Sequence, residues 1–150
     1  MKVILQKVKK ASVSIDGKIV GEIDKGYCLL VGVHKESTEA DAKYLAKKIV
    51  EARLFEDENE KLNFGLKDVN GSILSVSQFT LYADTKKGNR PSFTHAASAE
   101  EANELYNKFN EYLREEGIKV ETGIFQTMME VNIINDGPVT IIYEKLSLGN

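Results

Sequence analysis

The stretch Tyr27–Val33 (YCLLVGV) constrains the fold most, because its apolar character is almost unbroken. An apolar run of this length bounded by turn residues is typical of a strand that is covered on both faces. Before it, Lys2–Ile15 and Lys18–Ile23 alternate apolar and polar residues around Asp16–Gly17, a dipeptide favoured in two-residue hairpin turns. The sequence therefore predicts a central strand beside an antiparallel hairpin.

Two segments carry the signature of helices. Thr38–Asp41 and Ser98–Glu101 each have the spacing of a capping box, which satisfies the free N–H groups of a first helical turn. An apolar stripe at helical spacing follows each one, and Gly117 is placed to end the second helix. The stripes consist of Leu45, Ile49 and Ala52 in the first helix and of Ala102, Leu105, Tyr106, Phe109 and Leu113 in the second.

The remaining segments are assigned to strands and loops. Asn70–Gly71 predicts a hairpin turn into a strand at Ser75–Asp84, and the charged stretch Phe55–Asn63 predicts a surface loop. Further strands are expected at Ile118–Thr122, Met128–Ile134 and Val139–Leu146. Several hairpins with two separated helices predict an α+β fold, mainly antiparallel and barrel-like, with both helices packed on one side of a single domain that spans residues 1–150.

Charge and composition narrow the class of protein. The net charge of −3 argues against a general nucleic-acid coat protein, although it leaves room for a protein that touches only one end of an RNA. The chain has no apolar run as long as a membrane span, and its start does not resemble a signal peptide. The single cysteine, Cys28, is expected in the core. These features predict a cytoplasmic protein that binds neither membrane nor DNA.

Two stretches are the candidates for one functional site. A strand at Ser75–Asp84 that ends in Ser, Gln and Thr would place hydroxyl, amide and backbone N–H groups at one rim of a sheet. Asn135–Thr140 (NDGPVT) contains one of the 2 prolines of the chain. Between them, the long loop Ala83–Ala97 carries three cations, Lys86, Lys87 and Arg90.

Acid–base machinery is not visible in the sequence. The chain has no P-loop, no dinucleotide-binding glycine motif, and no metalloprotease or serine-hydrolase motif. His34 is expected to be a surface or capping residue, and His95 lies in the long loop, where contact with a substrate is the minority interpretation. Ser77 or Thr80 would need a neighbouring base to act as a nucleophile, and nothing nearby in the sequence supplies one.

Taken together, SQFTLYAD, TKKGNRPSF and NDGPVT resemble the D-aminoacyl-tRNA deacylases, the D-Tyr-tRNA deacylase family. The resemblance covers the whole chain, including MKVILQKVKKASV, DGKIVGEI, LAKKI and VETGIF. Two positions depart from the pattern: Lys7 stands where arginine is expected, and Gln126–Thr127 stands where small residues are common. These departures concern the support and lining of the site and leave both signature motifs intact.

The resemblance implies hydrolysis of the ester that joins a D-amino acid to the terminal adenosine of tRNA, without cofactor or metal. This ester is activated and has a vicinal 2′-OH, so positioning and oxyanion stabilisation can supply most of the catalysis. We assign the oxyanion to the N–H groups around Phe79 and Thr80. We assign the terminal adenosine to Ser77 and Gln78.

The resemblance also implies a homodimer in which a cis Gly137–Pro138 bond of one subunit enters the partner's SQFT pocket. There its carbonyl groups would accept from the substrate's α-ammonium, so that an L side chain would meet backbone while a D side chain would point to solvent. Glycine, which lacks Cβ, would be accepted. Asn135 and Met129 are placed in the same substrate-binding set, and Lys86, Lys87 and Arg90 are expected to bind tRNA.

Two other classes of function stay open. One is a small-ester or D-peptide hydrolase with Thr80 or Ser77 as nucleophile, which would cleave esters that lack RNA. The other is a non-catalytic RNA-end binder. An assay of D-Tyr-tRNA deacylation alongside free D-Tyr ester would separate the three.

Overall fold

The long strand β1 (Lys2–Ile15) connects the whole sheet in this computed structural model, which describes residues 1–147. One edge of β1 pairs antiparallel with β3 (Gly26–Gly32) and then with β2 (Lys18–Ile23). Its other edge pairs with β8 (Glu130–Glu144) from Lys2 to Ser14. The predicted hairpin at Asp16–Gly17 is confirmed, with both residues at positive φ.

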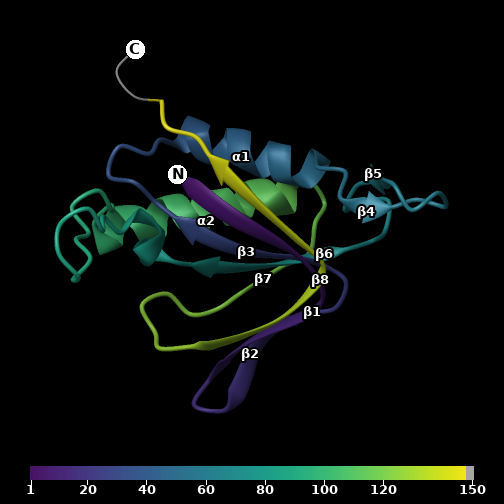
Figure 1. Ribbon diagram of the computed structural model, residues 1–150, viewed down its shortest axis with the longest axis horizontal. Helices are drawn as coiled ribbons and strands as arrows, with labels where there is room; N and C mark the ends of the chain where they lie inside the picture. The colour runs from purple at the N-terminus through teal and green to yellow at the C-terminus, as the bar shows by residue number, and fades with distance from the viewer. Residues whose placement is uncertain (148–150) are drawn as a thin grey trace.

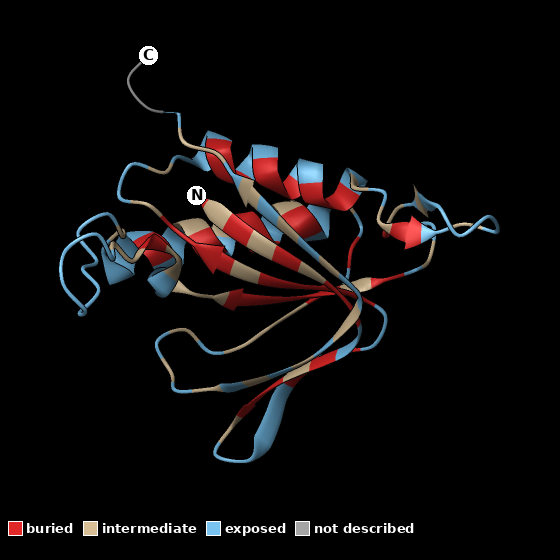
Figure 2. Cartoon of the chain, in the orientation of Figure 1, coloured by how far each residue is buried: buried red, intermediate tan, exposed pale blue. Residues whose placement is uncertain are grey.

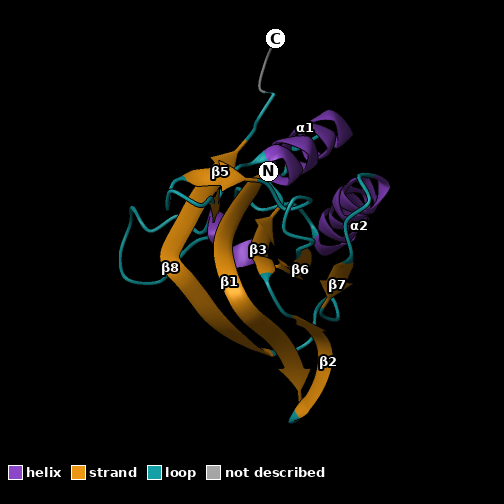
Figure 3. Cartoon of the chain, turned by 90° about the vertical axis from the view of Figure 1, so that its right-hand side faces the viewer, coloured by secondary structure: helices purple, strands orange, loops and turns teal. Residues whose placement is uncertain are grey.

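The sheet continues from β3 through β6 (Ser72–Ser77) to β7 (Val120–Thr122), and both of these pairs are parallel. The sheet curls so strongly that β2 approaches β7: a Cβ on Gly21 would lie 2.7 Å from the carbonyl oxygen of Thr122. The result is a mixed, nearly closed barrel in one domain (Figures 1 and 3). The predicted α+β class is confirmed.

Two helices, α1 (Glu39–Glu51) and α2 (Ala99–Glu115), lie side by side on one face of the sheet, as predicted (Figure 3). Thr38 and Asp41 form the expected capping box of α1, and the hydroxyl of Ser98 caps α2 by accepting from the N–H of Glu101. None of the helices in residues 1–147 is both long and apolar enough to span a membrane.

The central strand β3 is covered on both faces, which explains its apolar sequence. Most of β3 is drawn as buried in Figure 2. Tyr27 and Leu29 belong to the main core between sheet and helices, whereas Cys28 belongs to a second core inside the curl of the sheet. Cys28 is fully buried, and this burial raises the pKa of its thiol to about 12.

Two expectations about loops and turns are wrong. The segment predicted as a surface loop forms a separate two-stranded sheet, β4 (Phe55–Glu56) with β5 (Leu62–Phe64), since the Phe55 ring stacks on Tyr27 and anchors it. Asn70–Gly71 does make a turn, but β6 after it runs parallel to β3, because α1 separates these strands and allows a crossover.

Two strand boundaries also differ from expectation. The strand predicted for Ser75–Asp84 ends at Ser77 and is followed by a 3-10 helix, η1 (Phe79–Tyr82). The two strands expected on either side of NDGP are one strand, β8, whose register against β1 shifts between Gln6 and Lys10. An irregular edge position tolerates a proline, which cannot donate to the ladder, so the strand continues past Pro138.

Candidate active site

The end of β6 forms the centre of the candidate site. After Ser77 the N–H of Gln78 donates to the carbonyl of Val31 at 2.7 Å, and the chain then turns into η1. Gly32 in β3 leaves room for this turn. A Cβ at that position would be too close to its neighbours, at 2.9 Å from Cβ of Leu81 and 3.2 Å from the carbonyl oxygen of Gln78. The glycine thus allows η1 to pack directly on the neighbouring strand.

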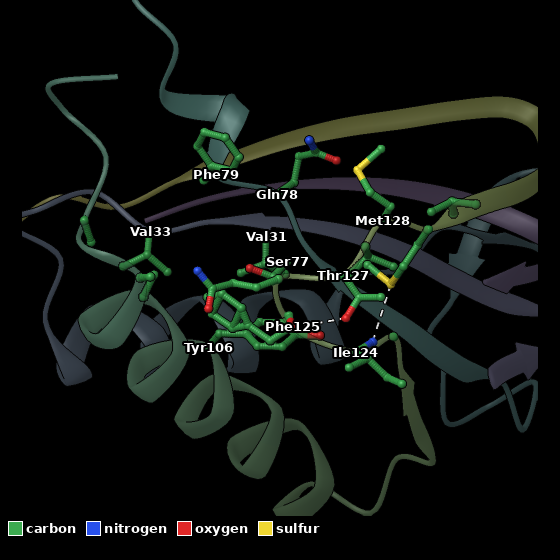
Figure 4. Close-up of a pocket in the computed structure, with 18 residues that line it drawn as sticks. Val31, Val33, Ser77, Gln78, Phe79, Tyr106, Ile124, Phe125, Thr127 and Met128 are labelled. Atoms are coloured by element: carbon green, nitrogen blue, oxygen red, sulfur yellow. Dashed lines mark hydrogen bonds between the residues drawn. The ribbon is translucent and has the colours of Figure 1, made fainter. Parts of the chain in front are cut away.

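A cavity of about 600 Å³ opens beside this turn. Phe79, Gln78 and Met128 lie along one side of it, and Tyr106 and Phe125 lie on the opposite side (Figure 4). Its size and its mainly apolar walls with a few polar groups are those of a small-molecule site.

Tyr106 of α2 connects the cavity floor to the strand that carries the site. Its hydroxyl donates to the carbonyl of Ser75 at 2.7 Å, and its ring meets Phe125 edge-on at 6.4 Å. Burial raises the pKa of this hydroxyl, which therefore stays protonated and able to donate. Sequence reasoning placed Tyr106 in the core stripe of the helix and missed this role. The available signal was a hydroxyl on an otherwise apolar face, since a buried tyrosine needs a hydrogen-bond partner.

The segment 123–129 forms another wall, of which the sequence indicates only Met129 and Gln126–Thr127. Gly123 allows Met129 to fold back over the backbone, because a Cβ on Gly123 would lie 2.5 Å from the Met129 sulfur. Gln126 has a positive φ of 58°, and Met128 is 91% exposed. Gln126 and Thr127, the residues that depart from the family pattern, both line the cavity, so the departure concerns its wall.

Within the described chain the cavity lining contains no His, Lys, Arg, Asp, Glu or Cys, and the hydroxyl of Tyr106 is engaged in donating to the Ser75 carbonyl. Thr80 is exposed and lies outside the lining, where its hydroxyl accepts from the amide of Gln78. The two histidines stack on each other elsewhere, with ring centroids 5.9 Å apart, and His95 Nε2 lies 3.6 Å from a carboxylate oxygen of Asp84. What the site offers is main-chain N–H, hydroxyl and amide groups.

The structure brings together only part of the predicted set. Ser77, Gln78, Phe79 and Met129 line the cavity, and Thr80 lies next to it. The loop cations Lys86, Lys87 and Arg90 are exposed and lie outside the lining.

Gly137 and Pro138 are exposed on β8 and do not line the cavity of their own chain. The peptide bond between them is cis, and Gly137 has a φ of 122°. Asn135 holds this turn: its Oδ1 accepts from the N–H of Val139 at 3.1 Å, and its Nδ2 donates to the Val139 carbonyl at 3.4 Å. The second signature stretch is therefore ordered and displayed on the surface.

Known proteins identify the class to which this fold and site belong. Residues 4–144 match the family described as D-Tyr-tRNA(Tyr) deacylase, and the chain belongs to that family. A D-aminoacyl-tRNA deacylase of Staphylococcus haemolyticus is 61% identical over 96% of this chain and 95% of its own length. The enzyme of that name from Limosilactobacillus reuteri is 60% identical over 97% of this chain and 100% of its own.

Solved structures agree on the fold. A protein described as c-Myc DNA Unwinding Element Binding Protein superimposes with a TM-score of 0.89 at 41% identity, covering 98% of this chain and 100% of its own. A probable eukaryotic D-amino acid tRNA deacylase superimposes with a TM-score of 0.81 at 16% identity, over 95% of this chain and 97% of its own, a likeness that shows the fold alone.

Proposed function

We propose that this protein hydrolyses the ester between a D-amino acid and the 3′-terminal adenosine of tRNA. Family membership and the names of its relatives support this activity. The observation that carries the proposal is the cavity beside Phe79, which within the described residues holds polar main-chain and side-chain groups but no general base. Such a site suits an activated ester, because the vicinal 2′-OH of the ribose can transfer the protons for which the protein supplies no base.

The terminal adenosine fits the cavity chemically. Phe79, Tyr106 and Phe125 give it aromatic walls, and Ser77 and Gln78 add hydroxyl and amide groups at one end. Aromatic side chains bind bases by stacking, while polar groups fix the orientation of the ribose.

The oxyanion is assigned to the main chain at Phe79 and Thr80. These residues open η1, and the first N–H groups of a helix have no acceptor within it. Water adds to the ester carbonyl, the two N–H groups stabilise the negative oxygen, and the carbon–oxygen bond to the ribose then breaks. The 2′-OH relays a proton to the departing ribose oxygen, and the products are a free D-amino acid and tRNA.

Chiral selection is assigned to Gly137–Pro138 of a second copy, in a homodimer. Gly137 and Pro138 lie outside the cavity of their own chain, so they are free to enter another. Apolar side chains are exposed along the same strand: Ile134 is 56% exposed and Ile142 is 68% exposed. A self-complementary contact between two copies would cover them. In this dimer, the carbonyl groups of Gly137 and Pro138 accept hydrogen bonds from the α-ammonium of the substrate. An L side chain then meets the backbone and is rejected, whereas D side chains and glycine are tolerated.

The acceptor end of the tRNA is assigned to Lys86, Lys87 and Arg90. They sit on one exposed loop of a chain whose net charge is −3, so a local patch is required if RNA is to bind. Clearing D-aminoacyl-tRNA in this way amounts to chiral proofreading and tRNA recycling, a cytoplasmic task.

The proposal is tested by offering the enzyme D-Tyr-tRNA, L-Tyr-tRNA and free D-Tyr ester in parallel. We expect release of tyrosine from D-Tyr-tRNA only. Equal cleavage of both tRNAs would refute chiral selection. Rapid cleavage of the free ester would favour a small-ester hydrolase, and binding of D-Tyr-tRNA without release would favour an RNA-end binder.

A further inference from the structure

Two phenylalanines at the mouth of the cavity face solvent together. Phe79 is 56% exposed and Phe93 is 38% exposed, and their ring centroids lie 5.0 Å apart at an angle of 59°. An aromatic side chain gives up favourable burial when it stays in water, so an exposed pair of this size marks a surface that binds something apolar.

The pair continues the cavity outward. Phe79 lines the cavity (Figure 4) and touches Phe93, which lies in the loop Ala83–Ala97. A chain segment that leaves the cavity past Phe79 therefore meets Phe93 next.

The loop holds Phe93 in place although its tip is exposed. Asp84 and Ser92 exchange two backbone hydrogen bonds, of 2.7 and 2.9 Å, immediately before Phe93. The N–H of Ala96 donates to the carbonyl of Phe93 at 3.1 Å, and the N–H of Lys35 donates to that of His95 at 2.9 Å. Phe93 is thus fixed from both sides of the loop.

Charge points to the kind of partner. The same loop carries three cations and one carboxylate, Asp84. That carboxylate accepts from the N–H of Lys86, which holds its pKa low, and it also faces His95. The negative charge of Asp84 therefore interacts with groups at the base of the loop, away from the exposed tip. Aromatic rings combined with cations are the features with which proteins bind single-stranded nucleic acid.

We infer that Phe93, together with Phe79, stacks the nucleobase that immediately precedes the terminal adenosine of the RNA. The inference rests on the proposed function, which places that adenosine in the cavity. Recognition then extends one nucleotide beyond the one that carries the ester, and the phosphate between the two bases passes the cationic loop. Phe93 is a positioning residue, because it touches the RNA and not the reacting atoms.

Binding of a short, non-acylated RNA that ends in CCA tests the inference independently of catalysis. The RNA is compared with one that has an abasic nucleotide before the terminal adenosine, on wild type and on Phe93→Ala. Removing either the base or the ring should weaken binding about 5- to 150-fold, the range for base–aromatic stacking. Removing both should cost no more than removing one. Phe93→Tyr, which keeps a ring, should bind like wild type.

Phe93→Leu covers the case in which Phe93→Ala does not fold, since leucine keeps the apolar volume without an aromatic face. Phe93→Leu should lose as much RNA affinity as Phe93→Ala, and the abasic nucleotide should weaken its binding no further. The inference would be overturned if the abasic nucleotide and the Phe93 substitution weakened binding independently, so that their losses multiply. It would also be overturned if neither change affected the RNA affinity.

Activity separates this inference from the proposed function. The loss of kcat/KM in Phe93→Ala should be larger for D-Tyr-tRNA than for D-tyrosyl-adenosine by the factor measured in binding. Equal losses on both substrates would overturn the stacking role while the deacylase function stands. If the binding losses are coupled as expected but the wild-type enzyme releases no tyrosine from D-Tyr-tRNA, the deacylase function fails and the stacking role survives.

Discussion

Replacing Gly137 by alanine should cripple D-aminoacyl-tRNA cleavage while leaving a folded protein. Gly137 has a φ of 122°, which L side chains rarely adopt, and an added Cβ would lie 2.8 Å from Cγ2 of Val139. A strained backbone of this kind costs about 1–3 kcal/mol. Domains are stable by about 5–15 kcal/mol, so the variant should fold, with a Tm lower by roughly 2–12 °C.

The loss of activity has a separate physical cause. The proposed site brings the substrate's α-carbon against Gly137 of the partner, where a methyl group would block the approach. We expect kcat/KM for D-Tyr-tRNA to fall by about 100-fold or more, the size of effect that a misplacement of about 1 Å can produce. Thermal unfolding and deacylation are measured on the same preparation.

Gly117→Ala is the matched control. Gly117 follows α2 with a φ of 87°, and nothing lies within 4 Å of the position of an added Cβ. This variant should lose similar stability through its backbone and keep its activity. If Gly117→Ala loses activity to the same extent, strain explains both variants and the role of Gly137 is refuted.

Mixing two inactive variants tests whether Gly137 acts in a second copy. Gly137→Ala is combined with Phe79→Ala, and subunits are allowed to exchange. One of the two sites in each mixed dimer would then have both an intact pocket and an intact Gly137. Because random exchange in an equal mixture makes about half of the dimers mixed, about one quarter of all sites would be active. An activity that never rises above that of the separate variants, or a wild-type monomer that is fully active, would contradict the arrangement.

Three further outcomes are expected. Thr80→Ala should keep measurable deacylation, whereas tRNA ending in 2′-deoxyadenosine should be cleaved about 100-fold more slowly or worse, as for a lost general acid–base group; an acyl-enzyme trapped on wild type would contradict this. Neutralising Lys86, Lys87 and Arg90 together should reduce the slope of log K against log salt by about 2–3 for tRNA binding, and an unchanged slope would mean that the loop is merely solvated. Iodoacetamide should leave Cys28 unmodified at pH 8 in the folded protein, because the pKa of its thiol is about 12 and the residue is fully buried; mass spectrometry would reveal any adduct.

Features set by local chemistry were predictable from the sequence. The Asp16–Gly17 turn, the cap at Thr38 and the stripe of α2 each depend on residues a few positions apart, and all appear in the structure. The central strand was also predictable, because burial on both faces leaves an apolar run at Tyr27–Val33.

Strand pairing was harder, because it depends on segments far apart in the chain. Asn70–Gly71 has the local chemistry of a hairpin, but α1 lies between β3 and β6. A helix between two strands is the signal of a parallel pair. The strand boundary at Ser77 was missed for another reason: η1 has only 4 residues, too few to show a helical period.

The candidate site was only partly accessible from the sequence. The motifs drew attention to Ser77, Gln78 and Phe79, and these residues do line a cavity. Its opposite wall comes from Tyr106 in a core stripe and from Phe125 in an irregular segment. No pattern connects these two residues with β6 until the chain is folded.

The pairing of β1 with β8 has a consequence for the order of events during synthesis. Lys2 pairs in register with Glu144, so β1 must wait on this edge until β8, which follows it far along the chain, has been synthesised. Contacts between such distant segments slow folding, since a long loop must close before they form. Until then one edge of β1 stays open, and its lysines discourage pairing with other chains. A partly synthesised chain therefore lacks both the completed sheet and the strand that displays Gly137.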